Sequence, residues 1–172
     1  MTFTIGLLGS LILVTGSAWP DKIVKKPHQS VKNWLFGIGT FFMLIYSILN
    51  YLDGGLVFFI FLQALTNIAT ILMLTDSPER ISKPLIIGLG ILLIAWSLNI
   101  SQGINTLFFI IGLSGIALGY VMKGGTLRRN LALMLGSILI AVLSYLEASW
   151  IFFWLNAFFA LFSGYYAWKV RK

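Results

Sequence analysis

The sequence predicts an all-α integral membrane protein with seven transmembrane helices, and three observations lead to this fold class. Hydrophobic residues make up 59% of the 172 residues and charged residues only 10%, whereas soluble domains average about 45–50% and about 25%. The apolar residues gather in runs close to the ~20 residues that a spanning helix needs. All 12 lysines and arginines lie outside those runs. This composition excludes a soluble enzyme, a disordered chain and a fibrous protein.

The first three apolar runs are expected to form helices over residues 4–20, 34–52 and 55–75. The first run ends at Pro20, which lacks the amide hydrogen that a helix interior needs. The second run ends before Asp53, because a charged side chain is costly in the hydrocarbon core. Together these runs form a predicted three-helix group.

Four further runs are expected to form helices over residues 84–100, 104–122, 130–147 and 149–168. The first of them begins at a proline, and the second ends before a lysine. The connections between the runs are short, so the sequence predicts a compact helical bundle without a soluble domain.

Lysine and arginine predict the orientation of the bundle. All 12 lie after the first, third or fifth run or in the carboxyl-terminal tail. Basic residues stay on the cytoplasmic side, so the amino terminus is expected outside and the carboxyl terminus inside. The net charge of +7 then belongs to the cytoplasmic face, and no nucleic-acid partner is expected. The predicted location is the plasma membrane, as a bacterial inner-membrane protein.

Two pairs of segments resemble each other. The turn from Tyr51 to Phe59 parallels the turn from Tyr145 to Phe153, an offset of 94 residues, and Gly6–Gly9 parallels Gly112–Gly115, an offset of 106. The sequence therefore predicts parallel triple-helix repeats at residues 4–75 and 104–168, joined by a linker helix at 84–100, in one transmembrane domain spanning 1–172. The alternative is seven unrelated helices with similar interfacial turns.

Three segments resemble a known family. The stretch from Ala18 to Lys26 has an aromatic residue, a proline and a basic loop, Leu44–Tyr46 reads Leu-Ile-Tyr, and Asn67 is a polar residue in the third helix. With the three-one-three topology, these segments resemble the SWEET, PQ-loop and PnuC-type transporter superfamily. Asp21 stands where that family has glutamine, and no proline lies mid-span. The resemblance implies a seven-helix transporter.

Ionisable groups are absent from the middle of every predicted span, and the chain has no cysteine. Proton relays, buried metal sites and thiol chemistry all need such groups. We therefore expect no enzymatic activity, no cofactor and no metal.

Neutral polar residues remain within the spans. On one face of the third helix lie residues spaced i, i+4 and i+7, and on one face of the seventh lie residues spaced i and i+7. We expect them near the membrane midplane, where repeat-built transporters bind their substrates. The alternative is that they hydrogen-bond or pack between helices. The candidate substrate-binding residues are Gln63, Asn67, Thr70, Asn156, Ser163 and, from the second helix, Tyr46.

The leading hypothesis is a SWEET- or PQ-loop-like membrane transporter. It would move a small neutral or zwitterionic polar solute by alternating access between the two repeats. The alternative is a non-transporting membrane scaffold or an accessory subunit of a membrane complex, which the lack of mid-span prolines and charges favours. The expected partners are the lipid bilayer and a small polar solute. A second copy of the chain or a subunit of a membrane complex is a further candidate partner.

Overall fold

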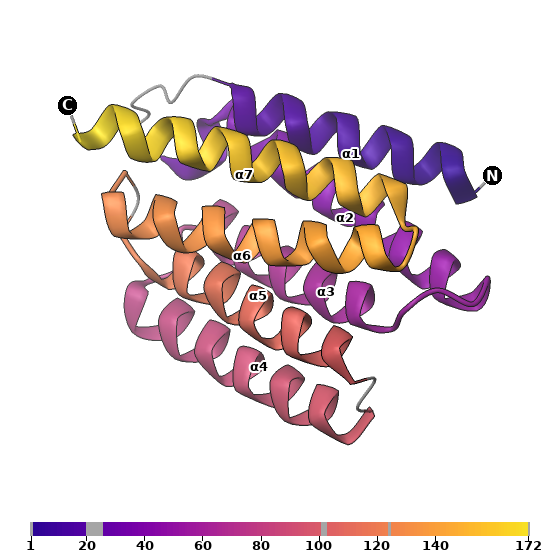
Figure 1. The fold of residues 1–172 in the computed structure, drawn as a ribbon. Coiled ribbons are helices and arrows are strands. Elements are labelled where there is room, and N and C mark those ends of the chain that lie inside the picture. The colour runs from indigo at the N-terminus through magenta and orange to yellow at the C-terminus, as the bar shows by residue number, and fades with distance from the viewer. Residues whose placement is uncertain (1, 20–25, 101–102, 124, 172) are drawn as a thin grey trace. The chain divides into compact units, whose positions relative to one another are not determined.

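The structure is a computed structural model of the chain and describes residues 2–19, 26–100, 103–123 and 125–171. The described residues form seven α-helices and one short 3₁₀ helix, and no strand lies among them (Figure 1). The predicted all-α fold class is therefore confirmed. The elements are α1 (Thr2–Ala18), η1 (Pro27–Gln29), α2 (Val31–Leu52), α3 (Phe58–Leu74), α4 (Glu79–Ile100), α5 (Ile104–Val121), α6 (Leu127–Leu146) and α7 (Trp150–Arg171).

Five of these helices, α2 and α4 to α7, are long and apolar enough to cross a membrane. Helices α1 and α3 are also apolar but have 17 residues each, about 25 Å at 1.5 Å per residue, against a hydrocarbon core of about 30 Å. The length and composition of the helices indicate an integral membrane protein.

Helices α2 and α6 begin earlier than the apolar pattern predicted, at Val31 and Leu127 rather than at residues 34 and 130. Each is preceded by a capping hydroxyl: Ser30 Oγ accepts a hydrogen bond from Asn33 N at 3.4 Å, and Thr126 Oγ1 accepts one from Arg129 N at 3.3 Å. A cap of this kind satisfies an amide of the first turn, so a polar first turn can precede the apolar run.

Helix α4 begins at Glu79, and Pro84 lies inside it rather than at its start. The carbonyl oxygen of Pro78 accepts hydrogen bonds from Ile81 N at 2.8 Å and Ser82 N at 3.0 Å. These bonds close the first turn. Proline at position 84 removes one backbone donor near the helix start, where the cost is smaller than in the helix centre.

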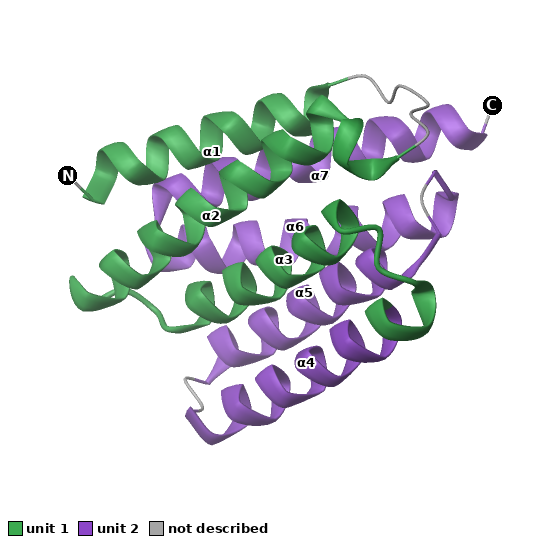
Figure 2. Ribbon diagram, turned by 180° about the vertical axis from the view of Figure 1, so that it is seen from behind, with its two compact units in different colours: residues 1–82 green, residues 83–172 purple. Residues whose placement is uncertain are grey.

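The chain divides into two compact units, residues 1–82 and residues 83–172 (Figure 2). In unit 1, α2 packs against both α1 and α3, and in unit 2, α6 packs against both α5 and α7. The middle helix of each group of three therefore contacts both of its chain neighbours.

Glycines allow close approach of the first two helices in each group of three. A Cβ atom added at Gly6, Gly9 or Gly39 would lie 2.7 Å from Tyr46, 2.9 Å from Phe42 or 2.6 Å from Leu13, respectively. In unit 2 the close pairs are Gly112 with Ile140 at 2.8 Å, Gly115 with Gly136 at 2.9 Å and Gly119 with Leu133 at 2.5 Å. Each close pair in unit 2 corresponds to one in unit 1. Adding 106 to the number of the residue on α1 gives the residue on α5, and adding 94 to the number of the residue on α2 gives the residue on α6. These are the two offsets predicted from the sequence. In the third pair the small and large residues are exchanged between the two helices.

The turn after α2 and the turn after α6 have the same backbone hydrogen bonds. Both have the pattern of a helix that ends in a residue of left-handed conformation. The bonds are Asp53 N to Leu49 O (3.0 Å), Gly54 N to Tyr51 O (3.0 Å) and Gly55 N to Asn50 O (2.8 Å), and, 94 residues later, Glu147 N to Leu143 O (3.1 Å), Ala148 N to Tyr145 O (3.1 Å) and Ser149 N to Ser144 O (2.8 Å).

These equivalent turns predict that Ala148→Gly stabilises the protein. Ala148 has a φ of +51°, and the equivalent residue, Gly54, has a φ of +94°. A left-handed conformation costs an L-residue other than glycine about 1–2 kcal/mol, so we expect a gain of about 1 kcal/mol in the free energy of unfolding, measured by circular dichroism in detergent. Ala95→Gly, on the exposed side of α4, is the control and is expected to lose about 1 kcal/mol, because glycine weakens a helix interior.

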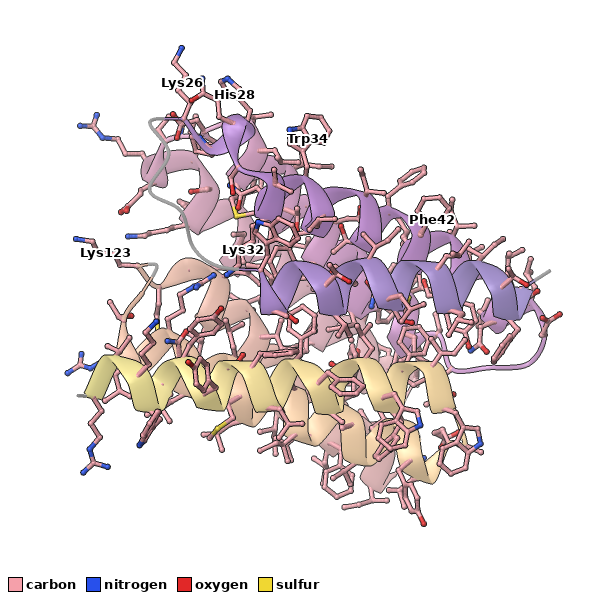
Figure 3. All side chains as sticks on the ribbon, turned by 90° about the horizontal axis from the view of Figure 1, so that it is seen from above. Lys26, His28, Lys32, Trp34, Phe42 and Lys123 are labelled. Carbon is pink, nitrogen blue, oxygen red and sulfur yellow. The ribbon has the colours of Figure 1, made fainter. Side chains whose placement is uncertain are left out.

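Charged residues lie close to the helix ends. Within the described part of the chain, each charged residue in an α-helix lies among the first five or the last three residues of that helix. Figure 3 shows Lys26, His28, Lys32 and Trp34 near one end of α2, with Phe42 further along. Trp34 Nε1 donates to His28 O at 2.8 Å and so ties η1 to α2.

Candidate functional site

All six candidate residues are buried in the protein, and none of them lies at an end of its helix. Tyr46, Gln63, Asn67 and Thr70 belong to unit 1, and Asn156 and Ser163 belong to unit 2. Their exposed fractions are 7%, 3%, 8%, 1%, 6% and 8% in that order. Buried polar side chains need hydrogen-bond partners, and those partners indicate what each side chain is available to do.

Asn67 joins α3 to α2. Its Nδ2 donates to the carbonyl oxygen of Thr40 on α2 at 2.7 Å and to that of Gln63 on its own helix at 3.0 Å. Both amide hydrogens are therefore used within unit 1. A solute that reached Asn67 would meet the side-chain oxygen, which is an acceptor.

A row of polar groups continues along α3 on either side of Asn67. Thr66 Oγ1 lies 3.1 Å from Gln63 O and 3.3 Å from Gln63 Oε1. Thr70 Oγ1 donates to Thr66 O at 2.7 Å. Sequence reasoning missed Thr66, although its position three residues after Gln63 was a usable signal. It also missed Thr40, because the contribution of Thr40 is a backbone carbonyl that no side-chain pattern reveals.

Asn156 differs from Asn67 in its hydrogen bonding. Its Nδ2 donates to Phe152 O at 2.8 Å, one turn earlier in α7. Ser163 lies two turns further along the same face of α7. The carboxamide of Asn156 is thus held by a bond within its own helix.

Tyr46 packs against the glycine face of α1. Its Cδ2 atom would lie 2.7 Å from a Cβ atom placed on Gly6, so the ring occupies the space that the missing side chain leaves. A larger residue at position 6 would displace the ring.

Asn50 is a half-buried polar residue that the sequence analysis did not select. Among the described side chains, its Nδ2 is the buried polar atom without a hydrogen-bond partner. The equivalent residue in unit 2 is Ser144, whose Oγ donates to Ile140 O at 2.7 Å. A Cβ atom at Gly55 would overlap the carboxamide of Asn50, so glycine at position 55 provides the space for the larger side chain.

The two acidic residues of the equivalent turns are Asp53 and Glu147. Glu147 Oε1 accepts a hydrogen bond from the carboxamide of Asn105 in the first turn of α5. This bond fixes the start of α5 to the turn between α6 and α7. Glu147 therefore has a structural partner in unit 2 in addition to its exposure to solvent.

An open surface groove of about 840 Å³ runs along α6 and α7, and several of its lining side chains, among them Tyr145 and Leu161, are exposed. Helix α6 contributes Met134, Ile138, Ala141, Val142 and Tyr145, and α7 contributes Phe153, Ala157, Ala160, Leu161 and Gly164. Among these side chains only the tyrosine hydroxyl is a hydrogen-bonding group. None of the six candidate residues lines this groove, and its surface is apolar.

Among the described residues, no three His, Asp or Glu side chains group together. No family model, curated protein or solved structure matches the chain. The stretch from Ala18 to Lys26, one of the three that carry the resemblance to the SWEET and PQ-loop families, includes residues 20–25, which lie outside the described residues.

Proposed function

We propose that the protein is a membrane transporter for a small neutral or zwitterionic polar solute. The single observation that carries this proposal is the pair of buried carboxamides, Asn67 in α3 and Asn156 in α7. Each lies in the interior of an apolar helix, one in each unit. Polar groups placed inside membrane helices are costly and mark substrate paths in many transporters.

The proposed architecture has seven spans, arranged as two parallel triple-helix repeats joined by α4. The equivalent turns and the equivalent glycine pairs at the offsets of 94 and 106 residues support a repeat. In the proposed topology the amino terminus lies outside and the carboxyl terminus lies in the cytoplasm of a plasma membrane. Alternating access would then consist of one three-helix group moving against the other.

In this proposal the carboxamides recognise a neutral solute by hydrogen bonds. Asn67 uses both amide hydrogens on backbone carbonyls, so it offers an acceptor to a solute hydroxyl or ammonium group. Further donors and acceptors would come from Gln63, Thr70 and Tyr46 in unit 1 and from Asn156 and Ser163 in unit 2.

The test is uptake into liposomes that contain the purified protein, with a panel of labelled sugars and zwitterionic amino acids. For any solute that wild type takes up, we expect Asn67→Ala and Asn156→Ala each to lower uptake at least tenfold, because the polar group of the solute would lose its hydrogen-bond partner in the binding site. Asn156→Ala is the cleaner variant, because it removes one bond within a single helix.

The matched control is Asn99→Ala. Asn99 also donates from Nδ2 to the carbonyl four residues earlier, Ala95 O at 3.2 Å, but it is exposed on α4. This variant should retain uptake. Wild-type uptake in both Asn67→Ala and Asn156→Ala would contradict the site assignment.

A second candidate function is a membrane scaffold or an accessory subunit of a membrane complex. The open apolar groove on the surface of α6 and α7 favours it, as does the use of both amide hydrogens of Asn67 on the backbone. A correctly folded protein that transports no solute of the panel would support this candidate over transport.

A further inference from the structure

Aromatic rings gather at the end of unit 2 where the chain turns from α6 into α7. Tyr145 lies in the last turn of α6, Trp150 is the first residue of α7, and Phe153 lies in the first turn of α7. Their ring centroids are 5.8 Å apart for Tyr145 and Trp150, 5.8 Å for Tyr145 and Phe153 and 6.1 Å for Trp150 and Phe153. Tyr145 is 58% exposed and Trp150 is 53% exposed. These three rings, named the ring cluster, therefore form an accessible aromatic surface.

The open apolar groove along α6 and α7 begins at this ring cluster. Tyr145 and Phe153 line its near end, and Met134 and Gly164 line its far end. Between these ends the groove follows each helix for about 16 Å at 1.5 Å per residue, close to the ~15 Å of hydrocarbon in one leaflet of a bilayer. A phospholipid with its headgroup at the ring cluster would thus lay one acyl chain along the groove.

The charge at this end of unit 2 suits a cationic group. The chain has no lysine or arginine from residue 84 to 122 or from residue 130 to 168, and the second range includes the whole turn between α6 and α7. Glu147 is the one acidic residue from 83 to 172, and it lies in that turn, where its Oε1 accepts a hydrogen bond from Asn105. Aromatic faces attract cations, quaternary ammonium groups above all. The ring cluster therefore favours an ammonium headgroup over an anionic one.

Unit 1 lacks this combination of rings and groove at the equivalent positions, which lie 94 residues earlier. Leu56 stands where unit 2 has Trp150. Leu161 lines the groove and is 67% exposed, whereas its equivalent, Asn67, is 8% exposed and bonded to α2. The difference between the two units assigns the site to unit 2 alone.

From the ring cluster, the groove that begins at it and the charge of this end, we infer that unit 2 binds a phospholipid whose headgroup carries an ammonium group. The ammonium group lies against the ring of Trp150, and one acyl chain follows the groove towards Gly164. The site is separate from the proposed solute path, since none of the candidate transport residues lines the groove. The inference does not depend on the chain being a transporter.

The test is native mass spectrometry of the full-length protein in detergent, with phosphatidylcholine or phosphatidylglycerol of identical acyl chains. Trp150→Leu introduces the residue that the equivalent turn of unit 1 has. We expect this variant to need about fivefold more phosphatidylcholine for the same occupancy, a change of about 1 kcal/mol that is typical of one exposed cation–π contact. Its retention of phosphatidylglycerol should not change.

Two further variants make the ring test specific. Trp150→Phe keeps an aromatic face and should retain most of the phosphatidylcholine binding. Trp96→Leu is the matched control, because Trp96 is 54% exposed on α4 and does not line the groove. This control should bind both lipids as wild type does.

Another pair of variants tests the groove itself. Ala157→Phe places a ring in the groove and should lower retention of both lipids by about fivefold or more, whereas Ile91→Phe, at a 63% exposed position on α4, should not. Circular dichroism checks that Ala157→Phe remains folded, and the Trp150 variants test the site without any change in the groove. Choline chloride, which has no acyl chain, should not displace phosphatidylcholine.

Four results would overturn the inference. The first is an equal loss of both lipids in Trp150→Leu, which would mean that the ring does not recognise the headgroup. The second is an equal loss of phosphatidylcholine in Trp150→Leu and Trp96→Leu, which would indicate a general effect of exposed tryptophans. The third is displacement of the lipid by choline chloride, which would assign the rings to a soluble ammonium compound. The fourth is unchanged lipid retention in a folded Ala157→Phe, which would place the acyl chain outside the groove.

Discussion

Gly136→Ala is expected to destabilise the protein by about 3 kcal/mol, at the upper end of the usual cost of overpacking. A Cβ atom at Gly136 would lie 2.7 Å from Gly112 O and 2.8 Å from Ile116 N. Both atoms belong to the backbone of α5, so no change of side-chain rotamer relieves the overlap. The two helices would have to separate, and the contacts along their whole interface would weaken.

The measurement is unfolding of the purified protein in detergent, followed by circular dichroism as the denaturant concentration rises. Gly88→Ala is the matched control, because a Cβ atom at Gly88 has no neighbour within 4 Å. This variant should be neutral or stabilised by about 0.5–1 kcal/mol, since alanine favours a helix over glycine. Equal stability of Gly136→Ala and wild type would mean that α5 and α6 lie further apart in the protein.

The helices could be predicted from the sequence because the hydropathy of a segment depends only on the residues that the segment contains. All seven apolar runs correspond to helices. The early starts of α2 and α6 and the late end of α7 have a common physical cause: capping and dipole interactions let a helix continue into polar residues. Ser30 and Thr126 cap first turns that contain Lys32 and Arg128, and α7 continues to Arg171 because cations are favourable at a helix carboxyl end.

The candidate site could be predicted only in part. Helical periodicity places Gln63, Asn67 and Thr70 on one face of α3, but it does not predict the bond from Asn67 to Thr40. That bond links residues that are 27 positions apart, and it depends on how α2 and α3 are aligned along their lengths. The apolar groove along α6 and α7 was also missed, because its lining brings together residues of two helices, such as Met134 and Ala157, and the apolar pattern of one helix does not show which residues of another lie beside it.

Asn67→Asp is expected to destabilise the protein by about 3 kcal/mol at neutral pH. The aspartate side chain has the size of asparagine, but it places a carboxylate oxygen where Nδ2 now lies 2.7 Å from Thr40 O and 3.0 Å from Gln63 O. Two hydrogen bonds then become two contacts between acceptors. An ionised carboxylate at the centre of an apolar helix carries a further cost of about 2.5–3.5 kcal/mol on the insertion scale, and part of it is relieved where the group takes up a proton.

Asn67→Leu separates the effect of charge from that of the lost bonds. Leucine has a similar size and makes no hydrogen bond, and bonds between membrane helices average about 0.6 kcal/mol, with a maximum near 1.7. We therefore expect Asn67→Leu to lose about 1 kcal/mol, measured by the same denaturant unfolding. At acidic pH the protonated carboxyl group of Asn67→Asp can donate one of the two bonds, so its stability should approach that of Asn67→Leu. A loss in Asn67→Asp that is no larger than in Asn67→Leu, and that does not change with pH, would mean that position 67 is in contact with water. In that case the bond to Thr40 would not be what holds α3 against α2, and Asn67 would be free to turn towards a solute.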